Sequence, residues 1–568
     1  MFHHVKELQF NARVSRPDPR FTAMPLEQFG GANGELKAAM PNLWSAYPIL
    51  NSVRKVLVKD WRTHKYTLFA ALLLLLTTLV VVAYYVNHPK PEPQADTWSY
   101  LYVVDRFQMH GQLVNFWRLP GYPLFIVLIY TLIGQGNLGA VSIVQAILFV
   151  LATLEVYVLC VLVLRRAWIA FLIGLLVGIN IPLLSYMKPL VSEAMSLWLL
   201  ASLALASVYF LSTLQVRRLW LVTACVLLLF LTRPEWIYLP VPLFAYLLLV
   251  ALWRGKASRL LLHALASILL LYAFLGGYIY INATQNHFAG VTWIENINAL
   301  GKVLQYNMQD EAPPQYASVS RILDKYVAKG MRDPYPILES KPLLIHNNAA
   351  LAGEFAESTI EHHPVEFLAK SVPIFFSSLT VYYEKSHITP HVHFARYLNW
   401  LDTEFHALYK WNIFFPFCAM IWLLLLCWRR TRQLRTVQMM GVVVFLGLYG
   451  LISTTLGAYR EYDYMRIHTP FDPLLILVIW STLLVGALLI VQRGPGALVW
   501  LASHSFLCQQ ISLARATMVI AGFCIVGLCL FAVRFLLAPG LSSLIGVIFL
   551  FLMSIATIFY YLRTSKAK

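Results

Sequence analysis

Long apolar runs separated by short polar stretches dominate the chain from residue 66 onward. A helix needs roughly 20 predominantly apolar residues to cross a bilayer, and twelve runs approach or exceed that length. They lie at 66–86, 138–164, 167–184, 190–213, 219–232, 236–252, 259–282, 411–428, 437–456, 471–491, 516–537 and 541–561. The pattern predicts an all-α polytopic membrane protein with about twelve transmembrane helices.

A thirteenth apolar run, 121–134 (GYPLFIVLIYTLIG), decides the topology. Basic clusters lie at the ends of the spans, at 165–166, 217–218, 254–259, 429–435, 493 and 563–568. If 121–134 does not cross, all of these clusters lie on the same side as the basic N-terminal segment, which is the cytoplasm by the positive-inside rule. If it crossed, every cluster would move outside. We therefore expect an interfacial helix at 121–134 and both termini inside.

This topology divides the chain into four regions. Residues 1–65 form a basic cytoplasmic leader, in which 41–60 is either a helix lying on the membrane surface or a solvated segment. Residues 66–282 form the N-terminal transmembrane core, with the first outer loop at 87–137. Residues 283–408 form an outer-face cap region, with an amphipathic helix expected at 344–360. Residues 409–568 supply the C-terminal transmembrane helices.

Composition excludes the soluble classes of protein. Hydrophobic residues make up 59% of the chain and charged residues 12%, which is about half the charged share of a soluble domain. The net charge of +17 fits cytoplasmic loops beside anionic lipid, so no nucleic-acid partner is expected. None of the seven cysteines falls in 283–408, so an external cap would lack disulfides.

Charged residues gather on the predicted outer side, where their cost near the membrane makes them functional candidates. They are Asp96, Asp105, Arg118, Lys188, Glu193, Arg233, Glu235, Arg460, Glu461, Asp463, Arg466 and Asp472.

Asp96 is the candidate catalytic residue. A carboxylate at the outer interface can act as a general base toward a hydroxyl nucleophile, and Tyr100 lies four residues on, on the same helix face. The alternative is structural, because an Asp that opens a helix is an ordinary N-cap.

The turn REYDYMRIHTPFDP is the candidate binding site for a lipid-linked phosphate. Arg460 and Arg466 suit charge-assisted contacts to phosphate, with Tyr464 and His468 in the same turn and Lys188 as a further cation. The alternative is an interfacial belt of aromatic and basic anchors.

The remaining candidates each have a structural alternative. Glu193 could bind a sugar hydroxyl or a metal, or simply occupy the favourable first turn of a helix. Arg233 could contact substrate or form an ion pair with Glu235. The histidines of HITPHVH (387–393) have a spacing that zinc could use, or are solvated loop residues. No cofactor is required by these patterns, and a divalent metal is left open.

The order of the short outer motifs resembles the GT-C superfamily of integral-membrane glycosyltransferases, nearest the protein O-mannosyltransferase and aminoarabinose transferase branch. The motifs are D-T-W-S-Y from Asp96, R-x-P-G-Y-P from Arg118, S-E-A from Ser192, T-R-P from Thr232 and Y-x-R-x-x-x-P-x-x-P from Tyr464. The similarity covers roughly 66–490. It departs from the mannosyltransferases in lacking an Asp-Glu pair, because Thr97 follows Asp96, and in carrying Ile467-His468 after Arg466.

The resemblance implies an inverting transfer of a sugar from a polyprenyl-phosphate donor to a glycan, lipid or protein hydroxyl. It implies that Asp96 is the essential carboxylate, and that interfacial helices occupy 97–134. Arg460, Arg466, Lys188 and Tyr464 would bind the donor phosphate, and the sugar or acceptor contacts would come from Tyr100, Asp105, Arg118, Glu193, Arg233 and His468. The expected location is a bacterial inner membrane, with the site facing the periplasm or exterior.

Two rival functions remain open at this point. A transporter or flippase would repeat broken spans between its halves, and the sequence shows no such pair. A membrane scaffold that displays 283–408 would make Asp96 dispensable.

Overall fold

The structure is a computed structural model that describes residues 48–340, 349–380, 394–428, 431 and 434–493. The predicted spans at 516–537 and 541–561 lie outside this range, and so do the histidines of the 387–393 motif. The chain divides into two compact units, Met1–Lys65 and Tyr66–Lys568. Of the first unit, the structure describes the beginning of helix α1.

The described residues form helices throughout, apart from one isolated bridge between Glu92 and Pro189. The first part of the chain contains α1 (Pro48–Asn87), α2 (Ala95–His110), α3 (Gly121–Ile133), α4 (Leu138–Leu164), α5 (Ala167–Gly178), α6 (Ile181–Met187), α7 (Glu193–Thr213), α8 (Val216–Phe230), η1 (Pro234–Tyr238), α9 (Pro240–Trp253) and α10 (Ala257–Asn286). The cap contains α11 (Trp293–Gln305), η2 (Gln309–Glu311), η3 (Pro314–Tyr316), α12 (Ala317–Val327), α13 (Pro334–Ser340), α14 (Ala349–His362) and α15 (Pro364–Ser378). The last part contains α16 (Ala395–Tyr409), η4 (Lys410–Phe414), α17 (Phe415–Cys427), α18 (Arg435–Gly457), α19 (Glu461–His468), η5 (Thr469–Phe471) and α20 (Asp472–Arg493).

The prediction of an all-α polytopic membrane protein is confirmed. Within the described residues, eight helices are long and apolar enough to cross a membrane, or nine if the bent pair α5 and α6 counts as one span. Helix α8, in the predicted span at 219–232, has only 15 residues and is not among these eight, although the predicted topology still requires it to cross. Helix α3 has 13 residues, which agrees with a helix at 121–134 that does not cross.

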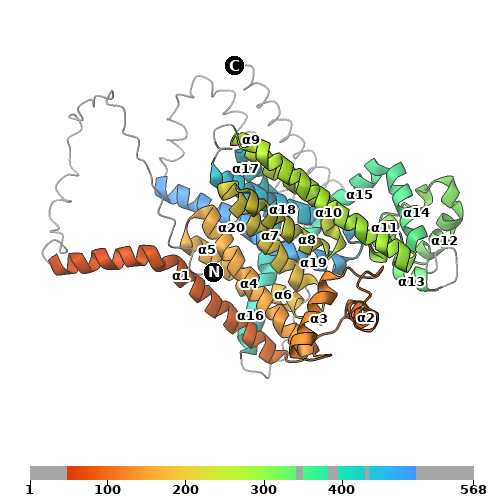
Figure 1. Cartoon of the computed structure of the whole chain (residues 1–568), viewed down its shortest axis with the longest axis horizontal. Coiled ribbons are helices and arrows are strands. Elements are labelled where there is room, and N and C mark those ends of the chain that lie inside the picture. The colour runs from red at the N-terminus through yellow and green to blue at the C-terminus, as the bar shows by residue number, and fades with distance from the viewer. Residues whose placement is uncertain (1–47, 341–348, 381–393, 429–430, 432–433, 494–568) are drawn as a thin grey trace, which may run out of the picture. The chain divides into compact units, whose positions relative to one another are not determined.

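The helical core is built from spans in which at least half of the residues are buried. Figure 1 shows α4, α7, α18 and α20 grouped together, and one continuous hydrophobic cluster runs through them. A helix pairs its backbone polar groups within the segment, which is the requirement for a span in lipid, and the mainly apolar side chains of these helices suit the same environment. Small residues allow close approach, since a Cβ on Gly450 of α18 would lie 2.2 Å from the Phe471 ring.

The span predicted at 167–184 is broken rather than straight. Helices α5 and α6 meet at a bend of 56°. Asn180 lies at the break, and its side-chain oxygen accepts a hydrogen bond from the Leu183 backbone N–H at 3.0 Å. An Asn cap followed by Pro182 starts a new helix here, because proline is favoured in a first turn and Asn caps it.

The cap has its own hydrophobic cluster, formed by α11 to α15. Figure 1 shows these helices together at one end of the core, beyond the end of α10. The amphipathic helix predicted at 344–360 is α14, which the structure describes from Ala349. Residues 66–568 nevertheless form one compact unit, so the cap packs on the core.

The segment after α1 is fastened to the turn between α6 and α7. Lys188 Nζ lies 2.5 Å from Glu92 Oε1, and Thr97 Oγ1 donates a hydrogen bond to the Leu190 carbonyl at 3.0 Å. A second contact joins α3 to the turn after α8, where the Gly121 N–H donates to the Leu231 carbonyl at 2.6 Å. These contacts bring the predicted outer loops to one end of the core.

Candidate active site

A cavity of about 580 Å³ lies where the first outer loop, the cap and the α19 turn meet. Its walls come from at least five separate segments of the chain. The lining residues are Ala95, Asp96, Ser99, Tyr100, Trp117, Arg118, Leu119, Ser192, Thr232, Arg233, Pro234, Glu235, Thr292, Ile294, Asn298, Asp333, Tyr335, Pro336, Tyr459, Arg460, Asp463, Arg466 and Ile467. We refer to it as the main cavity.

Asp96 is held between two guanidinium groups. Its Oδ1 lies 2.6 Å from Nη2 of Arg118, and its Oδ2 lies 2.6 Å from Nη2 of Arg466. The alternative role as N-cap is wrong, because α2 begins at Ala95 and Gln94 is the N-cap residue. The carboxylate therefore lines the cavity instead of capping the helix, with one oxygen on each arginine.

The charge state of Asp96 follows from these contacts. Burial alone would raise the pKa of this carboxyl, but the neighbouring Arg118 and Arg466 outweigh burial and lower the pKa to about 2. Asp96 is thus ionised at neutral pH. An opposite charge within hydrogen-bond distance favours the charged form.

The first outer loop orients Arg118. Its Nε donates to Ser99 Oγ at 2.7 Å, and its guanidinium lies 4.6 Å from the centre of the Tyr100 ring. Tyr100 in turn donates a hydrogen bond to Ser192 Oγ at 3.0 Å. The Tyr100 and Arg118 candidates therefore both lie in the cavity wall, one supporting the other.

Glu193 lies behind the cavity wall rather than in it. Its carboxylate is 1% exposed, and Oε1 accepts a hydrogen bond from Arg466 Nε at 2.8 Å. Arg233 approaches the same oxygen at 3.9 Å and pairs with Glu235 at 2.7 Å. Glu193 thus orients Arg466, so that one guanidinium joins Glu193 to Asp96.

Arg460 lies in the wall on the cap side. It forms an ion pair with Asp333, which comes from the loop before α13, and its side chain is 43% exposed. Tyr459 donates a hydrogen bond to Asp333 Oδ1 at 3.2 Å. The two arginines of the predicted phosphate site therefore face one cavity, but each is already paired with a carboxylate.

Besides Glu193, four of the predicted site residues do not line the main cavity. Lys188 is 2% exposed and paired with Glu92, and Asp105 is exposed on α2. Tyr464 is buried against Lys302 and Gln305. His468 is buried, with Nδ1 lying 2.6 Å from Asp472 Oδ1. Lys188 and His468 are thus held in ion pairs, Tyr464 is held by hydrogen bonds, and Asp105 lies exposed outside the cavity.

Several residues of the wall were not assigned a role from the sequence. Asp463 lines the cavity with no ion pair within 4 Å among the described residues, which makes it a second candidate base. Trp117 and Tyr335 supply an aromatic wall, and Asp333 supplies the partner of Arg460. Asp463 was visible as one charge in a crowded turn, but nothing in the sequence placed 333–335 opposite it.

One group of side chains in the described residues has the spacing of metal ligands, and it lies away from the main cavity. It consists of Glu311, His363 and Glu366 in the cap. Lys370 already pairs with Glu366 at 2.5 Å. A divalent metal in the main cavity stays an untested prediction.

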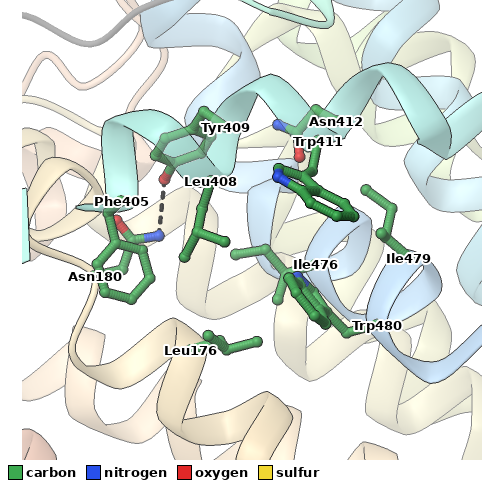
Figure 2. Close-up of a pocket in the computed structure, with 10 residues that line it drawn as sticks. All are labelled: Leu176, Asn180, Phe405, Leu408, Tyr409, Trp411, Asn412, Ile476, Ile479 and Trp480. Atoms are coloured by element: carbon green, nitrogen blue, oxygen red, sulfur yellow. Dashed lines mark hydrogen bonds between the residues drawn. The ribbon is translucent and has the colours of Figure 1, made fainter. Parts of the chain in front are cut away.

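A third site is a small cavity of about 20 Å³ between α5, α16, η4 and α20. Figure 2 shows Trp411 and Trp480 on one side of it and the hydrogen bond between Asn180 and Tyr409 on the other. This volume holds about one water molecule. It marks the bend at Asn180 and is too small for a sugar.

Comparisons with known proteins match different parts of the chain. The family model for manganese-containing catalase matches residues 1–79. The probable manganese catalase of Clostridium acetobutylicum is 39% identical over 67 residues, which is 11% of this chain and 30% of that protein. The chain thus spans less than a third of this relative, and the matched part excludes the main cavity.

Among solved structures, the archaeal oligosaccharyltransferase AglB from Archaeoglobus fulgidus is similar over 77% of this chain and 52% of that one, with 12% identity and a TM-score of 0.40. That structure was determined with an inhibitory peptide and a dolichol-phosphate. A likeness this distant assigns no function, so the functional argument rests on the geometry of the main cavity.

Proposed function

We propose that this protein is a membrane glycosyltransferase that moves a sugar from a polyprenyl-phosphate donor to a hydroxyl acceptor. The reaction would take place at the outer face, which in a bacterial inner membrane is the periplasmic side. The acceptor would be a glycan, a lipid or a protein.

The convergence of the outer motifs in one cavity carries the proposal. Asp96, Arg118, Arg233 and Arg466 belong to four motifs spread over 370 positions, yet all four side chains line the main cavity. Glu193, from a fifth motif, joins them through Arg466. Charged side chains near a membrane are costly unless paired or functional. An interfacial anchor belt does not require charged residues from five separate motifs to meet in one cavity.

The chemistry is a single displacement. The acceptor oxygen attacks the anomeric carbon from the face opposite the phosphate, its proton passes to Asp96, and the carbon–oxygen bond to phosphate breaks with its electron pair leaving on the phosphate. The leaving phosphate is already charged, so the reaction needs no general acid. Asp96 is ionised and can accept the hydroxyl hydrogen bond.

The arginines link donor binding to the basicity of Asp96. Arg118 and Arg466 each reach Asp96 in the ligand-free structure, and a guanidinium also suits bidentate contacts to phosphate. When the donor phosphate draws one guanidinium away, Asp96 loses a neighbouring positive charge and its pKa rises. The base is then strongest when donor is present.

Purified protein in liposomes tests the proposal directly. Polyprenyl phosphates carrying mannose, aminoarabinose or arabinose are supplied from outside, and release of free polyprenyl phosphate is followed over time. We expect release with one donor, dependent on Asp96. If every donor survives intact with a range of hydroxyl acceptors while the protein remains folded, the glycosyltransferase proposal is wrong.

A further inference from the structure

A second cavity of about 180 Å³ adjoins the main cavity on the cap side. We refer to it as the side cavity. Its lining residues are Gly301, Gln305, Arg332, Asp333, Tyr459 and Arg460. Asp333, Tyr459 and Arg460 also line the main cavity, so these three residues form a wall that the two cavities share.

The shared wall packs closely at Tyr459, but its ion pair between Arg460 and Asp333 is exposed to solvent. Asp333 accepts from both Arg460 and Tyr459, and Gly301 packs so closely that a Cβ there would lie 2.5 Å from the Tyr459 ring. The side chains of Arg460 and Asp333 are 43% and 33% exposed. A solvated ion pair of this kind contributes little, so Arg460 can exchange Asp333 for another anion at small cost.

Positive charge around the side cavity exceeds negative charge. Lys302, on the same helix as Gln305, is 1% exposed. Its Nζ lies 3.1 Å from Gln305 Oε1 and 3.1 Å from the Tyr464 hydroxyl. Neither Lys302 nor Arg332 has a carboxylate partner within 4 Å among the described residues. Three cations thus adjoin this cavity and one carboxylate, Asp333, faces it.

The state of Lys302 supports the same conclusion. Burial lowers the pKa of its ammonium group to about 7, because only neutral oxygens surround it. A buried cation without a counter-charge is unfavourable, and an anion in the neighbouring cavity would relieve that cost.

We propose that the side cavity binds an anionic group, a phosphate or a carboxylate, carried by the acceptor. Arg332 and Arg460 contact the anion. Lys302 lies behind Gln305 of the cavity wall and attracts the anion at longer range. The acceptor's hydroxyl then enters the main cavity past the shared wall. The assignment to an acceptor rests on the proposed function, whereas the anion site itself does not.

Binding of inorganic phosphate to the purified full-length chain tests the site without any sugar transfer. The measurement uses nanodiscs of phosphatidylcholine at constant ionic strength, in an Arg466→Gln background that weakens phosphate binding in the main cavity. Arg332→Gln and Lys302→Met should each weaken binding by about tenfold or more, since each removes one positive charge near the anion. Replacing a buried lysine by Met keeps the stem, so the fold should persist.

Two matched controls lie on α12 of the same cap. Arg321 and Lys325 are exposed, and Arg321→Gln and Lys325→Met should leave phosphate binding unchanged. Equal binding in all five proteins would overturn the proposal, as would failure of the reference protein to bind phosphate or acetate.

The source of the anion is distinguished in a separate arm. Nanodiscs that contain phosphatidic acid should compete with inorganic phosphate if the group is carried on a lipid, and should have no effect if it is carried on a soluble molecule. If the protein binds phosphate in the side cavity but transfers no sugar, the anion site stands and the proposed glycosyltransferase function is wrong. The two proposals can therefore fail independently.

Discussion

Asp96 divides its two oxygens between Arg118 and Arg466, so replacing it with Asn tests charge rather than shape. We expect Asp96→Asn to lower sugar transfer by roughly 10²–10⁴-fold, as is typical for loss of a general base. Asp105→Asn is the matched control, because Asp105 lies exposed on the same helix outside the main cavity. Initial rates with both proteins at equal membrane expression provide the measurement.

The result most damaging to this assignment is an active Asp96→Asn enzyme. In that case Asp463 becomes the base, because it lines the same cavity without an ion pair among the described residues. Asp463→Asn would then carry the large loss, and Asp96 would be a structural partner of the two arginines.

Arg466 makes two contacts that a lysine cannot reproduce. Its Nε reaches Glu193 while its Nη2 reaches Asp96. A single ammonium cannot make two contacts in this fixed geometry, so Arg466→Lys should keep the local charge but lower transfer at least roughly tenfold. Donor affinity and turnover measured separately check this expectation, with Arg217→Lys on the basic side as control. Wild-type turnover and affinity in Arg466→Lys would show that charge alone suffices.

Lys302 gives a pH-dependent stability effect whose sign follows from its lowered pKa. The group titrates near 7 when folded and near 10.4 when unfolded. Between these values the unfolded chain binds more protons, so stability from this group rises with pH and the cost is full below pH 7. Lys302→Met should therefore raise the melting temperature more at pH 6 than at pH 9. Thermal unfolding at both values measures it, and an equal change at both would contradict a buried cation.

At the scale of helices and turns, Gly121 decides whether α3 can meet the turn after α8. Its N–H donates to the Leu231 carbonyl, and a Cβ would lie 2.5 Å from that oxygen. The contact is with backbone, which cannot move aside cheaply. Gly121→Ala should thus destabilise the protein and reduce transfer, because Arg118 lies only three residues before this contact.

The matched control is Gly276→Ala in α10, where an added Cβ meets nothing within 4 Å. Alanine is the better helix former by roughly 1 kcal/mol, so this variant should be neutral or slightly more stable. Melting temperatures of the two variants in detergent make the comparison. A fully stable Gly121→Ala protein would show that the two turns are not held in register by this contact.

Sequence patterns predicted a helix well where its length and apolar composition determine its position. They did so less well where a single residue determines its end or bend. Apolar composition alone is enough to recognise the spans at 138–164 and 437–456. The bend at Asn180 depends on one capping side chain within an apolar run, and α8 ends at Phe230, just before the T-R-P motif. A single residue that ends or bends a helix does not change the hydrophobic periodicity, so the pattern does not reveal it.

The candidate site shows the same division between local and distant information. Charge alone predicts that the outer motifs share one side of the membrane, which stays a prediction. Asp96, Arg118, Arg233 and Arg466 do lie in one cavity. Lys188 could not be separated from them, because its burial against Glu92 depends on packing between distant segments. His468 pairs with Asp472 only four residues on, but the sequence does not show that both side chains are buried. Asp333 could not be assigned to the cavity from the sequence, because its pairing with Arg460 also joins distant segments.

The whole molecule makes a topological prediction that does not depend on chemistry. Basic clusters should be cytoplasmic, so single cysteines at 165, 217, 256 and 430 should resist an impermeant maleimide applied from outside. Cysteines at 310 and 390 should react, since the cap is predicted to be external. The background is a chain with its seven native cysteines replaced. External labelling at 217 or 430 would invert the predicted orientation of the site.

The pairing of every arginine in the main cavity has a consequence for how a substrate arrives. Four arginines and four acidic residues line this cavity, so it presents almost no net field to a phosphate at a distance. Long-range attraction raises encounter rates only where one sign of charge dominates. A donor would therefore have to find the cavity by lateral diffusion within the bilayer, and its capture rate should be nearly indifferent to the salt concentration of the surrounding medium.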